Sequence, residues 1–336
     1  MPEIVIALDA MGGDNAPGAA VEGAIAALEE WKDARVLLFG QKGIAEPRER
    51  LELVETTEVI TNDEAPMLAV RKKPGSSMVS AILAVKEGRA QAMVSAGSTG
   101  ALLASGMVRL GRIPGVERPA LATIIPSRKR PFLLIDSGAN VDCLPKYLVQ
   151  FGMMGSVYMH RILGVDQPRV GLVNIGAEAE KGNQLTKETH KLMCAQEQFC
   201  FAGNVEARDI PSGDFDVVVA DGFAGNLILK YTEGLAQALV GMLKDEIQSS
   251  RKSMLGAAMM KDAFQSFRSR MDYEEQGGAP LLGVNGAVVK AHGSSSARAF
   301  KNAIGQAYRM VKTGMVAEIE KGVREIAQAE KKEETP

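Results

Sequence analysis

One glycine-rich turn has the residue types expected of an anion site. Gly97-Ser98-Thr99-Gly100 follows a short apolar run and precedes a helical pattern over residues 102–110. The two glycines let the backbone bend sharply and let a ligand approach closely. A helix start directs free N–H groups and the positive end of its dipole at that ligand, and the Ser and Thr hydroxyls add donors. The turn predicts a phosphate site, although it is neither a Walker loop nor a dinucleotide fingerprint; an ordinary capped helix after a strand is the alternative.

Further strand-like runs also end in Asp, Asn or Gly. The polar or glycine residues that follow the runs 4–8, 131–135, 169–173 and 216–220 are Asp9, Asp136, Asn174 with Gly176, and Asp221 with Gly222. Open α/β sheets bind ligands at the carboxyl ends of their strands, so these residues are candidates to line one ligand cleft. The same residue types form ordinary turns, which is the structural alternative.

Three side chains at strand-to-helix junctions are candidates for catalysis. Lys181 stands in the glycine-rich turn after residues 169–173, where a compact charge can hold a phosphate. Asn226 stands where a helix begins, so its amide can contact a ligand or cap that helix. His292 stands between a strand and the Gly-Ser-Ser-Ser run that contains Ser294, and it can donate to an oxyanion or transfer a proton. A surface lysine and a structural histidine are the alternatives.

The composition limits the class of protein. The chain has 336 residues, of which 46% are hydrophobic and 35 are glycine, as in an α/β protein with many tight turns. The net charge of −2 argues against a nucleic-acid partner. The three cysteines, Cys143, Cys194 and Cys200, have no metal-binding spacing and predict reduced thiols. The sequence shows no signal peptide, and no apolar run approaches the ~20 residues of a spanning helix, so we expect a cytoplasmic protein.

The apolar periodicity alternates between strands and helices, which predicts a Rossmann-like three-layer α/β/α fold with a mostly parallel sheet and right-handed crossovers. The expected strands are 4–8, 34–40, 58–60, 121–126, 131–135, 169–173, 199–202, 216–220 and 288–291. The expected helices are 18–31, 44–51, 78–86, 102–110, 148–163, 185–196 and 297–311. We expect residues 1–226 and 274–330 to form this core, residues 277–286 to be a flexible loop beside the ligand, and residues 331–336 to be a disordered tail.

Residues 227–273 predict a long helical hairpin. Helical patterns over 227–250 and 261–273 are too long to bury both faces against a sheet edge, so the hairpin should project. Its tip combines apolar residues with cations, which suits an anionic membrane surface or a second subunit. The apolar tip residues are Met254, Leu255, Ala258 and Met259, and the cations are Arg251, Lys252 and Lys261.

Six segments in one order resemble the phosphate acyltransferases of bacterial phospholipid synthesis, the PlsX family. These segments are 9–14, 95–100, 174–183, 203–209, 221–226 and 290–295, within a resemblance that runs from residue 4 to about residue 325. The resemblance implies a fold like the phosphotransacetylases and the isocitrate and isopropylmalate dehydrogenases. It implies formation of acyl phosphate from acyl-acyl carrier protein and inorganic phosphate, with no metal or cofactor. It also implies a homodimer that associates peripherally with the membrane and supplies a membrane glycerol-3-phosphate acyltransferase.

A thioester is already activated, so the predicted tasks of this enzyme are to hold phosphate, aim it and stabilise an oxyanion. We expect the 97–100 turn, with Ser98 and Thr99, to hold phosphate. Lys181 would neutralise the phosphate or the oxyanion, while Asn226 and His292 hydrogen-bond either group. We expect Asp9, Asp136 and Asp221 to orient donors. The acidic carrier protein would dock on Arg71, Lys72 and Lys73, or on Arg251 and Lys252. A decarboxylating dehydrogenase, an acyl-CoA-dependent phosphotransacetylase and a non-catalytic membrane scaffold are the alternatives.

Overall fold

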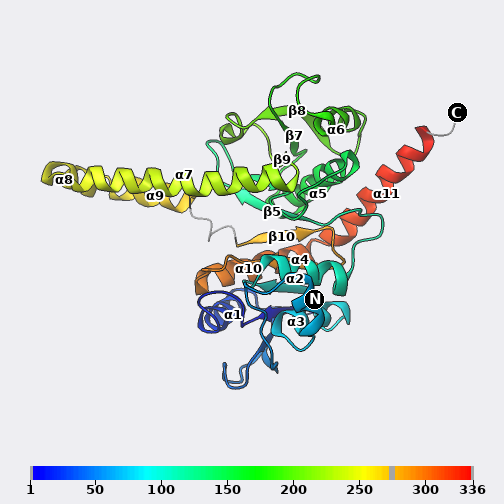
Figure 1. Ribbon diagram of the computed structural model, residues 1–336. Helices are drawn as coiled ribbons and strands as arrows, with labels where there is room; N and C mark the ends of the chain where they lie inside the picture. The colour runs from blue at the N-terminus through cyan, green and yellow to red at the C-terminus, as the bar shows by residue number, and fades with distance from the viewer. Residues whose placement is uncertain (1–2, 272–276, 334–336) are drawn as a thin grey trace.

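A computed structural model of the chain describes residues 3–271 and 277–333. The described strands form one eleven-stranded sheet in the order β3-β2-β1-β4-β11-β10-β5-β6-β9-β7-β8. Helices cover both faces of this sheet, and a helical hairpin projects from one side (Figure 1). The predicted α/β class with a mostly parallel sheet is confirmed.

The first half of the sheet consists of five parallel strands. They are β1 (Ile4–Asp9), β2 (Ala34–Gly40), β3 (Leu51–Glu55), β4 (Ala92–Ser95) and β11 (Ala287–Lys290). Alternate residues of these apolar strands point to opposite faces, so each face needs its own cover. Leu8 and Val94 pack beneath α1 (Gly18–Glu30) and α10 (Ala297–Lys312), whereas Ala7 and Met93 pack against α3 (Ser77–Lys86).

The second half runs in the opposite direction. Its parallel strands are β6 (Phe132–Ile135), β9 (Val217–Val219), β7 (Arg169–Asn174) and β8 (Cys200–Glu206). Two antiparallel strands, β10 (Ala279–Leu282) and β5 (Ala120–Ile125), join it to β11. The helices α5 (Pro145–Leu163) and α6 (Gln184–Cys194) pack against this half.

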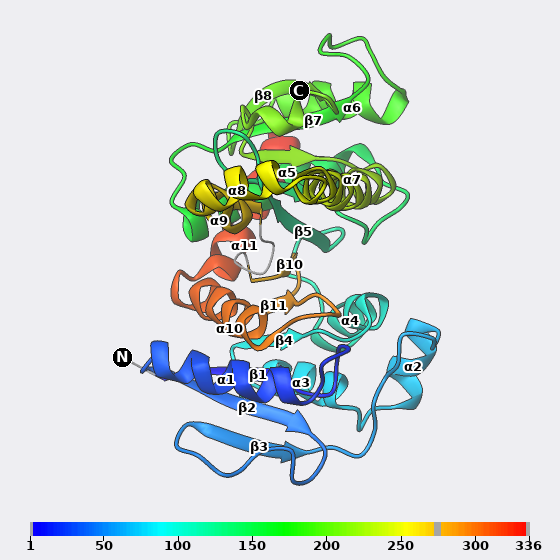
Figure 2. The same cartoon turned by 90° about the vertical axis from the view of Figure 1, so that its left-hand side faces the viewer.

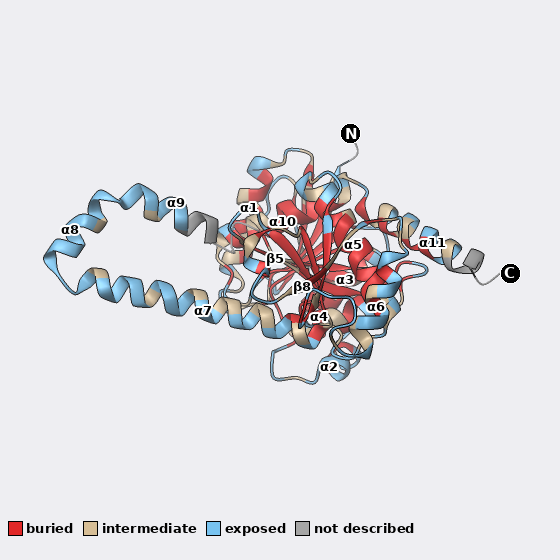
Figure 3. Cartoon of the chain, turned by 90° about the horizontal axis from the view of Figure 1, so that it is seen from above, coloured by how far each residue is buried: buried red, intermediate tan, exposed pale blue. Residues whose placement is uncertain are grey.

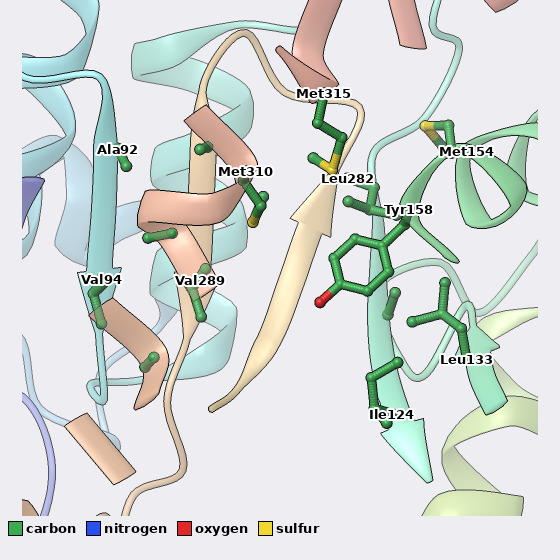
Figure 4. Packing of buried hydrophobic residues seen from close by; sticks show 14 of the residues in the cluster. Ala92, Val94, Ile124, Leu133, Met154, Tyr158, Leu282, Val289, Met310 and Met315 are labelled. Atoms are coloured by element: carbon green, nitrogen blue, oxygen red, sulfur yellow. The ribbon is translucent and has the colours of Figure 1, made fainter. Parts of the chain in front are cut away.

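Buried side chains fill the junction between the halves. Met310, Met315 and Leu282 pack near Tyr158 of α5 (Figure 4). The Tyr158 hydroxyl accepts a hydrogen bond of 2.7 Å from Gln306 Nε2 of α10, so the polar tip of the buried ring is satisfied. The last helix, α11 (Met315–Glu333), also packs on α5, so the end of the chain holds the two halves together.

Three helices form the projection. They are α7 (Gly222–Gln248), α8 (Arg251–Met259) and α9 (Lys261–Met271), and they extend away from the core with largely exposed surfaces (Figure 3). The predicted projection is confirmed, but its tip is the helix α8. Within the described residues no helix is both long and apolar enough to cross a bilayer. Residues 272–276, which include the predicted end of the hairpin, lie outside the described residues.

The structure differs from five expectations. The expected helix 44–51 is a set of turns that ends at β3, and residues 58–60 form only an isolated bridge between Glu58 and Ser76. The expected flexible loop 277–286 contains β10, whose Leu281 and Leu282 are buried. The tail expected from residue 331 is helical through Glu333, whereas residues 334–336 lie outside the described part. The predicted core–hairpin boundary at 226/227 falls inside α7, which starts at Gly222.

Candidate active site

The loops after β1, β4 and β11 meet at one end of the first half-sheet (Figure 2). A chain of hydrogen bonds joins two of them: the Gly97 N–H donates to Ser95 Oγ (3.0 Å), and the Ser95 hydroxyl donates to Asp9 Oδ2 (2.7 Å). The Met11 N–H donates to Asp9 Oδ1 (3.1 Å). Asp9 therefore orients the donors that shape the Gly97 turn.

Glycine is required where these loops touch. A Cβ atom at Gly12 would lie 2.4 Å from the Gly97 nitrogen, so any side chain there would push the two loops apart. The third loop is fixed by the Asp14 N–H, which donates to Gly293 O (2.7 Å), and by Asn15 Nδ2, which donates to Ser294 O (3.2 Å). We name the ends of these three strands, residues 9–15, 95–100 and 290–296, the glycine cluster.

A buried lysine supplies positive charge to the glycine cluster. The Lys290 side chain is 8% exposed, and its ammonium donates to Ala96 O (3.3 Å) and to Ala291 O. Burial lowers the pKa of Lys290 to about 8, although the charges of Asp9 and Asp14 oppose that shift. Burial likewise raises the pKa of Asp9, against hydrogen bonds from Ser77 and Ser95. The predicted site residues did not include Lys290, Ser77 or Ser95.

The Gly97-Ser98-Thr99-Gly100 segment has the predicted strand–turn–helix form. Ser98 is the N-cap of α4 (Thr99–Ser105), with its Oγ accepting from the Ala101 N–H at 3.4 Å. Thr99 is exposed, and Gly97 is buried beside Asp9. The short helix continues into the π-helical turn η1 (Gly106–Leu110). The turn thus presents one hydroxyl at the surface and one at the helix cap.

His292 pairs with Ser294 in the same cluster. His292 Nδ1 lies 2.8 Å from Ser294 Oγ and accepts a 3.3 Å hydrogen bond from the Ser294 backbone N–H. Because Nδ1 faces Ser294, Nε2 is the ring nitrogen through which His292 would donate to a ligand, and that role stays a prediction.

A second cluster lies where β6 and β9 end. The buried Asp136 carboxylate accepts from the N–H groups of Leu121 (3.1 Å), Gly138 (3.1 Å), Ala139 (2.9 Å) and Asn140 (2.6 Å). Burial raises its pKa, while these hydrogen bonds oppose the shift. Asp136 therefore holds the turn 136–140, and its direct contact with a substrate stays a prediction.

The start of α7 packs on that turn. The Gly222 N–H donates to Asn140 O (2.7 Å), and a Cβ at Gly225 would lie 1.9 Å from Asp136 O. The N-cap is Asp221, whose Oδ1 accepts from the Ala224 N–H at 2.7 Å. The cap alternative for Asn226 is therefore wrong: Asn226 lies inside the helix, is exposed, and its amide lies beside Gly138.

The loop after β7 presents Lys181. Asn174 shapes this loop, because its Nδ2 donates to Lys181 O (3.0 Å) and its Oδ1 accepts from the Ile175 N–H (2.9 Å). The Lys181 side chain is exposed and passes close to Gly176, where a Cβ would lie 3.0 Å from Lys181 Cγ. Asn174 and Gly176 therefore position the lysine.

An electrostatic contact connects the two halves. The charge of Lys230, two turns into α7, helps to lower the pKa of Lys290 in the glycine cluster. The start of α7 therefore lies close to that cluster, and Asn226 is one helical turn before Lys230. Cys143 beside Asp136 is no candidate nucleophile, because burial raises the pKa of its thiol to about 12.

Two solved structures of phosphotransacylases share this fold. A phosphotransacetylase from Streptococcus pyogenes matches with a TM-score of 0.58 and 16% identity, covering 92% of this chain and 94% of that chain. A branched-chain phosphotransacylase from Enterococcus faecalis V583 matches with a TM-score of 0.59 and 16% identity, covering 92% and 99%. At these identities the likeness defines the fold alone.

Sequence comparison defines the family. The family model described as fatty acid synthesis protein matches residues 4–318, and the chain belongs to this family. A phosphate acyltransferase of Clostridium botulinum (strain Loch Maree / Type A3) is 50% identical over 325 residues, which cover 94% of this chain and 97% of the relative. A phosphate acyltransferase of Alkaliphilus oremlandii (strain OhILAs) is 46% identical over 333 residues, covering 97% and 99%. The resemblance inferred from the six segments is confirmed.

Proposed function

We propose that this chain is a phosphate acyltransferase of phospholipid synthesis that takes its acyl group from acyl-acyl carrier protein. The observation that supports it most is the glycine cluster, where the buried Lys290 ammonium lies against Ala96, directly before the Gly97 turn, and brings positive charge to it. Similarity to phosphate acyltransferases at 50% and 46% identity, over 94% and 97% of this chain, supports the reaction class.

The proposed reaction is one nucleophilic substitution at the thioester carbonyl. A phosphate oxygen attacks the carbonyl carbon and forms a C–O bond, while the carbonyl oxygen becomes an oxyanion. The oxyanion then collapses, the C–S bond breaks, and the thiolate of the carrier arm leaves and takes a proton from water. Phosphate dianion is nucleophilic enough that orientation and charge stabilisation are the main tasks of the enzyme.

We assign one role to each part of the site. The Gly97–Gly100 backbone with Ser98 and Thr99 binds phosphate, and Lys181 neutralises the phosphate or the oxyanion. Asn226 and the Nε2–H of His292 donate to the carbonyl oxygen. Supporting observations are the exposure of Lys181 and Asn226 and the contact of His292 Nδ1 with Ser294. We also propose that four further residues face the substrate: Asp9, Asp221, Gly222 and Ser294.

We further propose a cytoplasmic homodimer that binds the membrane peripherally. The hairpin supplies both contacts: its stem pairs with a second subunit, and Met254, Leu255, Ala258 and Met259 touch an anionic bilayer. Leu255 is 67% exposed and Met259 is 83% exposed, which supports an interaction surface at the tip. Such a location would deliver acyl phosphate to a membrane glycerol-3-phosphate acyltransferase.

The first test is thiol release from acyl-acyl carrier protein with and without inorganic phosphate, with hydroxylamine to trap acyl phosphate as a hydroxamate. Phosphate-dependent release with hydroxamate is expected. Release from acetyl-CoA alone would indicate a phosphotransacetylase, and release from neither donor would favour the scaffold alternative.

The residue assignments have their own test in this assay. Lys181→Ala and Asn226→Ala should each lower kcat by about 10²–10³-fold, the cost of removing one preorganised charge or donor. Both positions are exposed, so both variants should keep the wild-type melting temperature. Lys187→Ala, an exposed lysine of α6, is the matched control and should retain wild-type kcat. Wild-type rates in both site variants would remove Lys181 and Asn226 from the mechanism.

A further inference from the structure

An exposed apolar patch lies next to the glycine cluster. It comprises Met67 and Leu68 of α2 (Pro66–Lys72), which are 43% and 52% exposed, and Met107 and Val108 of η1, which are 39% and 44% exposed. Arg109 ties the two elements together, because its Nη2 donates to Val70 O at 3.0 Å. We name these four side chains with Arg71 and Lys72 the α2 patch. Exposed apolar side chains on two adjoining elements are typical of an interaction site.

Two cations of the α2 patch extend into solvent. Arg71 and Lys72 occupy the last turn of α2 and are exposed. The neighbouring Lys73 is engaged within the protein, since its Nζ donates to Glu64 Oε1 (2.8 Å) and to Val59 O (2.9 Å). The predicted basic cluster of three is therefore a pair. A pair of exposed cations beside apolar side chains complements an acidic protein surface.

The position of α2 relates this patch to the reaction. Pro66, the first residue of the helix, lies against the anion turn: a Cβ at Gly100 would be 2.7 Å from Pro66 Cγ. The helix has 7 residues and so spans ~10 Å from Pro66 to Lys72. A partner seated on α2 is thus separated from the turn by little more than one short helix.

The other basic candidate is too distant within the same subunit. Arg251 and Lys252 follow the 27-residue helix α7, whose axis spans ~40 Å from its start beside the site. An acyl group presented there would lie several times farther from the Gly97 turn than one presented at α2. The distance favours α2 for a partner that must deliver a reactive group.

We propose that the α2 patch docks the acyl donor, an acidic carrier protein that presents its thioester on a flexible arm. This inference rests on the proposed function. Met67, Leu68, Met107 and Val108 receive apolar side chains of the carrier, while Arg71 and Lys72 pair with its carboxylates and steer its approach. The arm then passes Pro66 and places the thioester carbonyl beside the phosphate at Gly97–Gly100.

The test compares two charge-reversal variants with two donors. The variants are Arg71→Glu/Lys72→Glu in the α2 patch and Arg251→Glu/Lys252→Glu in the hairpin, the matched control. The donors are acyl-acyl carrier protein and the same acyl chain on coenzyme A. We expect the α2 variant to raise KM for the carrier by about tenfold with kcat nearly unchanged. The KM for acyl-coenzyme A and the melting temperature should stay as in the wild type.

A second variant separates apolar docking from charge. Leu68→Gln keeps both cations and should also raise KM for the carrier alone. Fluorescence anisotropy with labelled acyl carrier protein measures binding without turnover, so it tests docking even if the wild type proves inactive. Inactivity of the wild type toward both donors would refute the proposed function, whereas wild-type carrier binding that the α2 substitutions leave intact would refute the docking surface. The docking surface would also be refuted if only the hairpin variant lost affinity for the carrier. The same holds if the α2 variants lost binding to vesicles rather than to the carrier.

Discussion

The buried pair of Asp9 and Lys290 gives the glycine cluster a charge that depends on pH. Both groups pay a desolvation cost, which raises the pKa of the carboxyl and lowers that of the ammonium to about 8. Each charge stabilises the other, and the Ser95 hydroxyl adds a donor to Asp9. A positive Lys290 under the Gly97 turn would attract an anion, whereas a neutral one would not.

Anion affinity should therefore fall as the pH rises through about 8. Calorimetric titration with sulfate, whose own charge is constant, should give a Kd that rises above pH 8 by up to about tenfold per pH unit. Lys290→Met should bind sulfate weakly with no such pH dependence. A wild-type Kd that stays constant from pH 7 to 9.5 would show that Lys290 does not act on the anion.

The lowered pKa of Lys290 also makes the free energy of unfolding depend on pH. The pKa of Lys290 in the folded chain lies below the ordinary lysine value of 10.5, so between about pH 8 and 10.5 the unfolded chain binds more protons at this residue than the folded chain. This residue therefore makes stability rise with pH across that window, and the contribution disappears in Lys290→Met.

At the scale of elements, the site depends on how closely the strand-end loops approach. Gly12 of the β1 loop is the example in the glycine cluster, because its missing Cβ leaves room for the Gly97 backbone. The hydrogen bonds from Gly97 to Ser95 and from Ser95 to Asp9 require the same separation. A methyl group at Gly12 would therefore displace the backbone of the Gly97 turn.

Gly12→Ala should weaken phosphate binding and lower the free energy of unfolding by about 1–3 kcal/mol, as overpacking against backbone does. Gly18→Ala is the matched control, since nothing lies within 4 Å of a Cβ at that first residue of α1. The control should be neutral or stabilising by up to about 1 kcal/mol, because alanine reduces the freedom of the unfolded chain. Thermal unfolding and phosphate titration of both variants check this; equal behaviour of the two would contradict the steric argument.

Prediction from sequence succeeded where one local signal dominates. The buried run 34–40 matches β2, and the strand–turn–helix form predicted for Gly97–Gly100 is present, with Ser98 as the N-cap of α4. Failures occurred where tertiary contacts decide: β10 lies among glycines and a proline that locally favour a loop, yet its neighbours bury it. Lys290 was missed because one charge at the end of an apolar strand does not reveal its burial.

The sequence could not show how the two strand-end clusters lie relative to each other in space. The rule that ligands bind at the carboxyl ends of strands grouped Asp9, Asp136 and Asp221 correctly as strand-end residues. The rule does not reveal that the two half-sheets run in opposite directions, since β10 and β5 reverse the sheet through non-local pairing. The proximity of Lys230 to Lys290 follows from that reversal and from the placement of α7.

At the scale of the whole molecule, the hairpin exposes large apolar side chains to water, which is unfavourable unless a partner covers them. Its stem carries Leu239 and Val240, which are 55% and 50% exposed, and its tip carries Leu255 and Met259. The two sets lie on different helices, so the proposed dimer pairing and the proposed membrane contact can be separated by substitution.

Leu255→Glu/Met259→Glu should reduce binding to anionic vesicles by about tenfold or more, because it replaces apolar contact by like-charge repulsion. The dimer and turnover in solution should persist. Leu239→Glu/Val240→Glu, the stem control, should lower the molar mass in light scattering toward that of one chain. Vesicle sedimentation provides the other readout; unchanged vesicle binding by the tip variant would remove the tip from the membrane contact.

The position of β11 constrains how this protein is made. This strand, formed by residues 287–290, lies between β4 and β10 in the middle of the sheet and brings Lys290 to the glycine cluster. During synthesis on a ribosome, β4 emerges nearly two hundred residues earlier and must wait with an unpaired edge until β11 arrives. A nascent chain therefore has no complete anion site until residues 290–296 have been translated, and until then the open edge of β4 is the surface that a chaperone would need to shield.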